Sequence, residues 1–225
     1  MTTIRLVLMY FFGQKDNGVV IKTGSQASRL KPGDCVSFLG VGTHTTKIQV
    51  DHRVVAHLPD AITFEEAADL LVVHTTAYHA LANLAKLTKA KLVLIQAVTG
   101  SVAQIAVWIA FHLDMSVHVT VGWENKRRLL ANTHNLLKKH RFNSRDASFI
   151  KSKCLATLGT FVEIGLCNIL NDTRLDTKQF GKSTAFKFFN KFTLYEEDAA
   201  ALRQDLNETF KLESLALLIM SSILT

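Results

Sequence analysis

The sequence has few of the residues that build covalent or metal-bound frameworks. Its 225 residues include only three cysteines, Cys35, Cys154 and Cys167, an odd number with no two of them two residues apart. This pattern predicts neither a disulfide framework nor a zinc knuckle. Buried free thiols in a reducing compartment, which we expect to be the cytoplasm, are the simplest interpretation. Two prolines and eleven glycines also argue against long flexible linkers.

Apolar runs long enough to cross a membrane are missing at both ends of the chain. Residues 1–13 hold one basic residue and a short apolar run without a clear cleavage site, so we predict a strand rather than a signal peptide. Residues 212–225 are apolar but too short to span a bilayer. We therefore expect no membrane partner, and a buried segment or the seam of a homodimer at the C-terminus. With 48% apolar and 20% charged residues, the chain is predicted to fold around one sizeable core or two modest ones.

Positive charge exceeds negative charge by seven, and much of it lies in residues 126–128 and 138–141. Basic clusters attract phosphate on nucleic acids, membranes or cofactors, and they also occur as solvated helix faces. Both interpretations stay open for these clusters. A nucleic-acid partner is not expected, because the aromatic residues that would stack on bases are not interleaved with the basic ones.

The first 60 residues have the pattern of short strands joined by turns. Lys31-Pro32-Gly33-Asp34 is a turn signal, because proline presets its φ angle and glycine accepts a positive one. Apolar, β-branched segments around it are strand candidates. They are Val19–Ile21, Val36–Leu39, Ile48–Val50 and Val54–Ala56.

The next segment changes to a helical pattern. Thr63, followed by Glu65 and Glu66, predicts a helix N-terminus with a hydroxyl cap and acids in the first turn. We expect this helix to end at about Leu71 and a second helix to cover about Thr75 to Leu84.

A βαβ unit follows. The continuous apolar run Leu92–Ile95 is typical of a strand buried on both faces of a parallel sheet. A helical stripe from Val102 to Leu113, a strand at Ser116–Val121 and a helix at Glu124–Leu137 come next. This order predicts an α/β fold. The later segments 160–164 and 184–189 resemble strands, and residues 196–210 resemble an amphipathic helix.

The turn after Leu92–Ile95 reads Val98-Thr99-Gly100-Ser101-Val102-Ala103. Dinucleotide-binding folds place glycines here, so that the pyrophosphate reaches the free N–H groups of the next helix. Only the central glycine is present, and Val98 is awkward at the first glycine position. We predict that Gly100, Ser101, Val102 and Ala103 bind a dinucleotide, with an ordinary βα turn as the alternative. Lys126, after the second strand, would favour the 2′-phosphate of NADP over NAD.

Several segments in one order resemble a known family, the enoyl reductase domain of fungal highly reducing polyketide synthases. The resemblance runs from about Gly13 to about Asn190. That domain belongs to the zinc-independent, quinone oxidoreductase-like medium-chain dehydrogenase/reductases. The segments that carry the resemblance are Asp51–Ala56, Leu58–Asp60, Phe64–Ala68, Val73–Leu81, Val119–Gly122, Phe142–Asp146 and Gly159–Gly165.

The resemblance implies a fold in three parts. Residues 1–60 would be a partial GroES-like β-barrel that lacks its beginning. Residues 61–192 would be a shortened Rossmann doubly wound parallel sheet, with an internal deletion near residues 147–154. Residues 193–225 would be a C-terminal helical segment. The deletion leaves too few residues for a crossover, so the sheet is expected to lack a strand near the point where cofactors bind.

The resemblance also implies a chemistry. Such domains transfer a hydride from NADPH to an α,β-unsaturated acyl thioester on an acyl carrier protein, without a metal. Thr76 falls where the family has a threonine near the nicotinamide. Leu166 stands where a lysine is usual, Asn168 where an aspartate is common, and Asn190 where a second acid is expected. Leucine and asparagine cannot perform acid–base chemistry, so we assign no catalytic residue and keep an inactive relic of the family as the alternative.

Four further residues have ordinary interpretations. His74 and His79 are five residues apart, which does not place both on one helical face to bind a metal. Tyr78 could donate a proton, but a packing role is more common for a tyrosine. Cys167 has no evident supporting base and is interpreted as structural.

Overall fold

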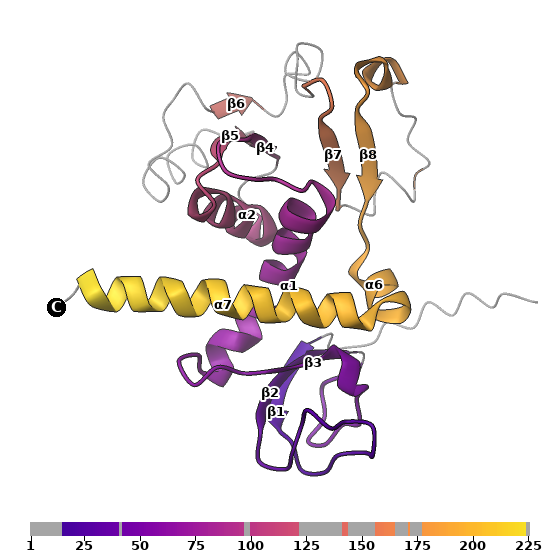
Figure 1. The fold of residues 1–225 in the computed structure, drawn as a ribbon, viewed down its shortest axis with the longest axis vertical. Helices are drawn as coiled ribbons and strands as arrows, with labels where there is room; N and C mark the ends of the chain where they lie inside the picture. Colours follow the sequence, from indigo (N-terminus) through magenta and orange to yellow (C-terminus); the bar gives the residue numbers. More distant parts are fainter. Residues whose placement is uncertain are drawn as a thin grey trace, which may run out of the picture. The chain divides into compact units, whose positions relative to one another are not determined.

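The structure is a computed structural model that describes residues 15–40, 42–96, 100–121, 141–143, 156–164, 171 and 177–223. The chain divides into two compact units (Figure 1). Unit 1 contains Met1–Val72 and Thr193–Thr225, and unit 2 contains Val73–Phe192. The C-terminal helical part therefore belongs to the same unit as the N-terminal strands. The three-part domain division with boundaries after residues 60 and 192 stays a prediction.

The sheet of unit 1 is antiparallel. It contains β1 (Lys15–Val19), β2 (Cys35–Leu39) and β3 (Val55–His57) in that order. The predicted turn before β2 is confirmed, because the Asp34 N–H donates to the Lys31 carbonyl at 3.1 Å and Gly33 has a φ of 96°. A positive φ at this position favours glycine.

Three sequence predictions for the N-terminal part of unit 1 were wrong, and the strand predicted in residues 1–13 lies outside the described residues. The strand predicted at Val19–Ile21 instead covers Lys15–Val19, and Ile21 is exposed. Residues 48–50 form no strand, and the Ile48 side chain is 38% exposed. A run of three apolar residues is too short to dictate strand pairing by itself. Cys35 is exposed rather than buried, because it is the first residue of β2 and pairs with the exposed Val19 at the end of the sheet.

Helix α1 (Phe64–Tyr78) begins as predicted, with a reciprocal capping box. The Thr63 hydroxyl accepts from the Glu66 N–H at 3.2 Å, and the Glu66 carboxylate accepts from the Thr63 N–H at 2.8 Å. This backbone hydrogen bond lowers the pKa of Glu66. The predicted division into two helices was wrong, since α1 continues directly into the π-helix η2 (His79–Leu84). The residues between the two predicted helices include no glycine or proline, and β-branched valines lower helix propensity too little to end a helix.

Two C-terminal helices replace the single one expected over residues 196–210. They are α6 (Lys191–Glu197) and α7 (Ala199–Ile223). Asp198 separates them and caps α7, because its carboxylate accepts from the Ala201 N–H at 3.0 Å. Leu202, Leu206 and Phe210 of α7 are buried in the same core cluster as the residues of β2 and β3.

Unit 2 contains two parallel sheets. The first has the order β4 (Leu92–Ile95), β5 (Ser116–Val121) and β6 (Arg141–Asn143), and α2 (Ser101–His112) connects its first two strands. This confirms the predicted βαβ unit. The second has β7 (Thr160–Glu163) and β8 (Ala185–Phe188), with the 3₁₀-helix η4 (Thr177–Lys182) between them. Among the residues that the structure describes, no strand pairing joins the two sheets.

The prediction that β4 is buried on both faces was wrong. Only Ile95 is buried, and Leu92 is 59% exposed. The reason is that β4 lies at the end of its sheet, with β5 as its one strand neighbour within the described segments. A doubly wound sheet that has lost a central strand would divide in this way. Residues 147–154, where the deletion is predicted, lie outside the described residues.

Candidate functional site

The start of α2 follows the carboxyl end of β4, the edge at which ligands bind in parallel sheets. Gly100 precedes the helix with φ of −79° and ψ of 150°, and its carbonyl accepts the first helical hydrogen bond, from the Gln104 N–H at 3.0 Å. Among the described residues no side chain caps this end, and the first turn contains no acidic residue. The N–H groups and the positive end of the helix dipole are therefore available to an anion.

The structure gathers four of the predicted cofactor-binding residues at this helix start. Ser101 is exposed, and Val102 and Ala103 are half-buried. The φ of Gly100 is one that any residue can adopt, so the backbone conformation does not require a glycine here. Val98, Lys126 and the expected helix at residues 124–137 lie outside the described residues. The role of all these residues in cofactor binding stays a prediction.

Thr76 lies in α1 and is buried, next to the equally buried Thr75. Thr75 is 2% exposed, and its hydroxyl has no hydrogen-bond partner in the described part of the chain. A buried polar group without a partner costs about 1–3 kcal/mol. A polar group supplied by a bound ligand would offset that cost. The same stretch of α1 packs with α2, because Ala77 belongs to the core cluster that contains Val107 and Ile109.

Strand β8 and Phe189, the residue that directly follows it, contact the two ends of the π-helix η2, an arrangement that we call the β8 clamp. At one end, the Lys187 ammonium group donates to the Leu84 carbonyl at 2.7 Å. At the other, the Phe189 ring stacks on the His79 ring with centroids 4.4 Å apart. Lys187 and Phe189 are two positions apart and so share one side of the extended chain. Short π-helices are frequent at functional sites, and this one directly follows the threonines of α1.

Replacing Lys187 by methionine is expected to lower the free energy of unfolding by about 1.5–3 kcal/mol, the range for a hydrogen bond to a charged group. Methionine keeps the apolar stem but leaves the Leu84 carbonyl without its donor. Urea unfolding followed by circular dichroism measures the change. Lys91→Met is the matched control, because Lys91 is exposed. Equal losses in the two variants would show that the β8 clamp does not stabilise the fold.

The side chain of Asn190 has a structural role. Its carbonyl oxygen accepts from the Phe192 N–H at 3.0 Å and caps α6. Leu166 and Asn168, the other departures from the resembled family, lie outside the described residues.

Two features are missing from the described part of the chain, a cluster of metal-binding side chains and a membrane-spanning helix. No group of three or more histidine, cysteine, aspartate or glutamate side chains there is arranged to hold a metal ion. None of the helices found there is both long and apolar enough to cross a membrane. His79 and His74 both take part in packing, since His79 stacks on Phe189 and the His74 ring meets the Trp108 ring edge-on at 6.1 Å.

Comparison with known sequences identifies close relatives. No protein-family model matches the chain. The highly reducing polyketide synthase ZEA2 of Gibberella zeae is 47% identical, and the reducing polyketide synthase hmp8 of Hypomyces subiculosus is 46% identical. Each alignment covers 94% of this chain but 10% of the relative, so the chain spans about a tenth of their length. The alignments extend over 238 positions, more than the 225 residues of the chain, so the relatives contain positions that have no counterpart here.

Solved structures share the fold. The CurK enoyl reductase is 23% identical with a TM-score of 0.70, and the match covers 92% of this chain and 68% of that one. The Escherichia coli quinone oxidoreductase, solved in complex with NADPH, is 21% identical with a TM-score of 0.70, covering 91% and 71%. These likenesses confirm the predicted α/β fold with its Rossmann-type sheet. The chain is therefore related to the fungal highly reducing polyketide synthases, of which it matches a segment about a tenth of their length, and it shares the fold of solved enoyl reductases and quinone oxidoreductases.

Proposed function

We propose that this chain is an enoyl reductase-like oxidoreductase that binds NADPH at the start of α2. Its substrate would be an α,β-unsaturated acyl thioester carried on an acyl carrier protein. The observation that carries the proposal is the uncapped, acid-free N-terminus of α2 at the carboxyl edge of a parallel sheet. The comparisons support the proposed class of oxidoreductase. Two relatives are polyketide synthases, and one solved neighbour is a quinone oxidoreductase in complex with NADPH.

The described residues fit a dinucleotide. The pyrophosphate would lie against the N–H groups of Ser101, Val102 and Ala103, where the helix dipole favours negative charge. The hydroxyl of Thr75, buried without a partner, and that of Thr76 would meet polar atoms near the nicotinamide. Lys126, outside the described residues, would pair with the 2′-phosphate and select NADPH over NADH.

Bound NADPH would supply a hydride to the β-carbon of the substrate, while the α-carbon takes up a proton and the double bond becomes single. The part of this chain would be to orient the cofactor and to exclude water, which are large contributions to such catalysis. Leu166 cannot donate a hydrogen bond to the thioester oxygen, and Asn190 cannot exchange a proton. We therefore expect that water would be the proton source and that turnover would be slow.

The alternative is a catalytically inactive relative, and one observation favours it. The Asn190 carboxamide accepts a backbone N–H and caps α6, a structural task that leaves it no acid–base role.

Titration with NADPH, followed by nicotinamide fluorescence, tests the proposal, with NADH as the control cofactor. We expect saturable binding that is tighter for NADPH, and slow consumption of NADPH when a crotonyl thioester of pantetheine is added. Binding without turnover would favour the inactive relative. Absence of binding to a chain that is folded by circular dichroism would overturn the proposed cofactor site.

A further inference from the structure

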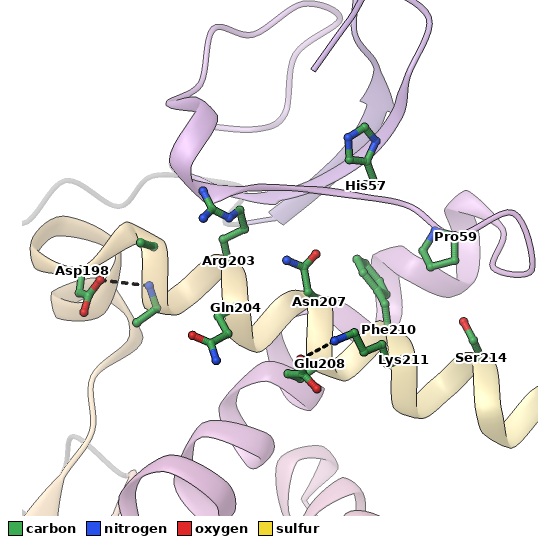
Figure 2. A pocket seen from close by; sticks show the side chains of 12 residues that line it. His57, Pro59, Asp198, Arg203, Gln204, Asn207, Glu208, Phe210, Lys211 and Ser214 are labelled. Carbon is green, nitrogen blue, oxygen red and sulfur yellow. Dashed lines mark hydrogen bonds and ion pairs between the residues drawn. The ribbon is translucent and has the colours of Figure 1, made fainter. Parts of the chain in front are cut away.

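A long groove runs along α7 within unit 1 (Figure 2). It has a volume of about 950 Å³, and its lining residues extend from Asp198 to Ser214 along the helix. At 1.5 Å per residue this is a length of about 24 Å. The opposite wall carries His57 and Pro59, and Arg203 and Asn207 point from α7 toward the segment that contains His57. The groove is open to solvent, and most of its lining residues are polar or charged.

Arg203, which lines this groove, lies near a second arginine, Arg29, and neither has an anionic partner among the described residues. Arg203 donates to the Arg53 carbonyl at 3.4 Å, and Arg29 donates to the adjacent His52 carbonyl at 3.0 Å. Both guanidinium groups therefore lie against the same short 3₁₀-helix, η1 (His52–Val54). Within the described ranges, neither has a carboxylate at ion-pair distance. Burial and then the nearby charge of Arg203 lower the pKa of Arg29, as expected for two cations that share no anion.

The carboxylates around the groove are already engaged. Glu208 pairs with Lys211 at 2.6 Å, and Asp198 accepts a backbone N–H in the first turn of α7. Asp51 pairs with Arg53 at 2.6 Å, and the hydrogen bonds from Arg53 lower the pKa of Asp51 to about 2. The arginine pair thus keeps free N–H donors, since a guanidinium has five and each of the two uses one here.

We propose that this groove binds an extended acidic segment of a partner protein. A carboxylate of that segment would lie between Arg203 and Arg29, because the guanidinium fork matches a carboxylate in a bidentate arrangement. The side-chain amides of Gln204 and Asn207, farther along α7, would pair with backbone groups of the segment. Phe210 provides an apolar floor.

The shape and composition of the chain favour this occupant over two others. The N-terminal residues 1–13 of the chain itself contain no acidic residue, so they cannot supply the anion. A small anion would contact only the two arginines and would leave most of the groove empty. A partner protein is consistent with relatives about ten times longer than this chain, in which such a unit has neighbours.

Fluorescence anisotropy with a labelled nine-residue peptide of alternating aspartate and glycine tests the proposal on the full chain. The same peptide with asparagine in place of aspartate is the control ligand. We expect the acidic peptide to bind, binding to weaken with added salt, and Arg203→Gln or Arg29→Gln to lower the affinity about tenfold. Lys22→Gln, at an exposed lysine of unit 1 that does not line the groove, should leave it unchanged.

Three results would overturn the proposal. The first is that Lys22→Gln lowers the affinity for the acidic peptide as much as Arg203→Gln does. The second is that the asparagine peptide binds as tightly as the aspartate peptide. The third is that inorganic pyrophosphate displaces the acidic peptide completely from the same arginines. Arg203→Lys keeps the positive charge but loses the planar guanidinium with its paired donors. Weaker binding of the acidic peptide by this variant therefore separates bidentate recognition from a folding defect. NADPH titration of Arg203→Gln should match that of the unmodified chain, which keeps this test independent of the proposed cofactor site.

Discussion

Replacing Ser101 by glutamate is expected to weaken NADPH binding at least tenfold while leaving the fold intact or slightly more stable. Ser101 is the exposed first residue of α2, where a carboxylate interacts favourably with the helix dipole by about 0.3–1 kcal/mol. The same carboxylate would occupy the position proposed for the pyrophosphate and repel it, at a cost of about 1–4 kcal/mol at contact distance. Stability and affinity should therefore change in opposite directions.

Nicotinamide fluorescence measures the affinity of this variant, and thermal unfolding measures its stability. Ser101→Gln is the matched control, because glutamine has the size of glutamate without its charge. We expect the glutamine variant to bind NADPH within about threefold of the unmodified chain, since a neutral side chain adds no repulsion. If glutamate weakened binding no more than glutamine did, the phosphate would not lie at the start of α2.

Replacing Leu206 by alanine is expected to lower the free energy of unfolding of unit 1 by about 2–5 kcal/mol. Leu206 is 1% exposed and belongs to the core cluster that α7 shares with the antiparallel sheet. The substitution removes buried methyl groups and leaves a cavity that the surrounding side chains fill only in part. Because domains of this size are stable by about 5–15 kcal/mol, the loss would be a large part of the total.

Urea unfolding followed by far-ultraviolet circular dichroism measures this loss. Gln204→Ala, two residues away on the exposed side of the same helix, is the matched control and should change stability by less than about 0.5 kcal/mol. A comparable loss in both variants would mean that α7 is not held by its buried leucines.

The local patterns of the sequence predicted much of what lies along the chain. The capping residues at Thr63 and Glu66 and the turn at Gly33 depend on interactions within a few residues, and the strands β4 and β5 lie in short, largely apolar runs. The placement of Gly100 to Ala103 at a helix start followed from the strand, turn and helix order alone. The resemblance to a family added the division into three parts, the enoyl reductase chemistry and Thr76 as a candidate site residue.

Contacts between distant segments were not predicted. Lys187 and Leu84, which form one end of the β8 clamp, are 103 positions apart, and Arg203 meets the Arg53 carbonyl across 150 positions. The exposure of β4 was predicted wrongly because an apolar run shows what a strand can bury, while its neighbours decide what it does bury. The groove along α7 likewise exists only because a C-terminal helix packs beside an N-terminal strand.

The sequence by itself therefore determined the βαβ unit, the start of α2 and the resemblance to polyketide synthases, because these rest on short-range periodicity and ordered motifs. Tertiary structure alone decided that the parallel strands form two sheets, that a lysine of β8 holds the π-helix and that two arginines share one short helix without an anion. Such features depend on which surfaces meet when the chain folds, and residues that meet across a hundred positions leave no periodic signal in one sequence.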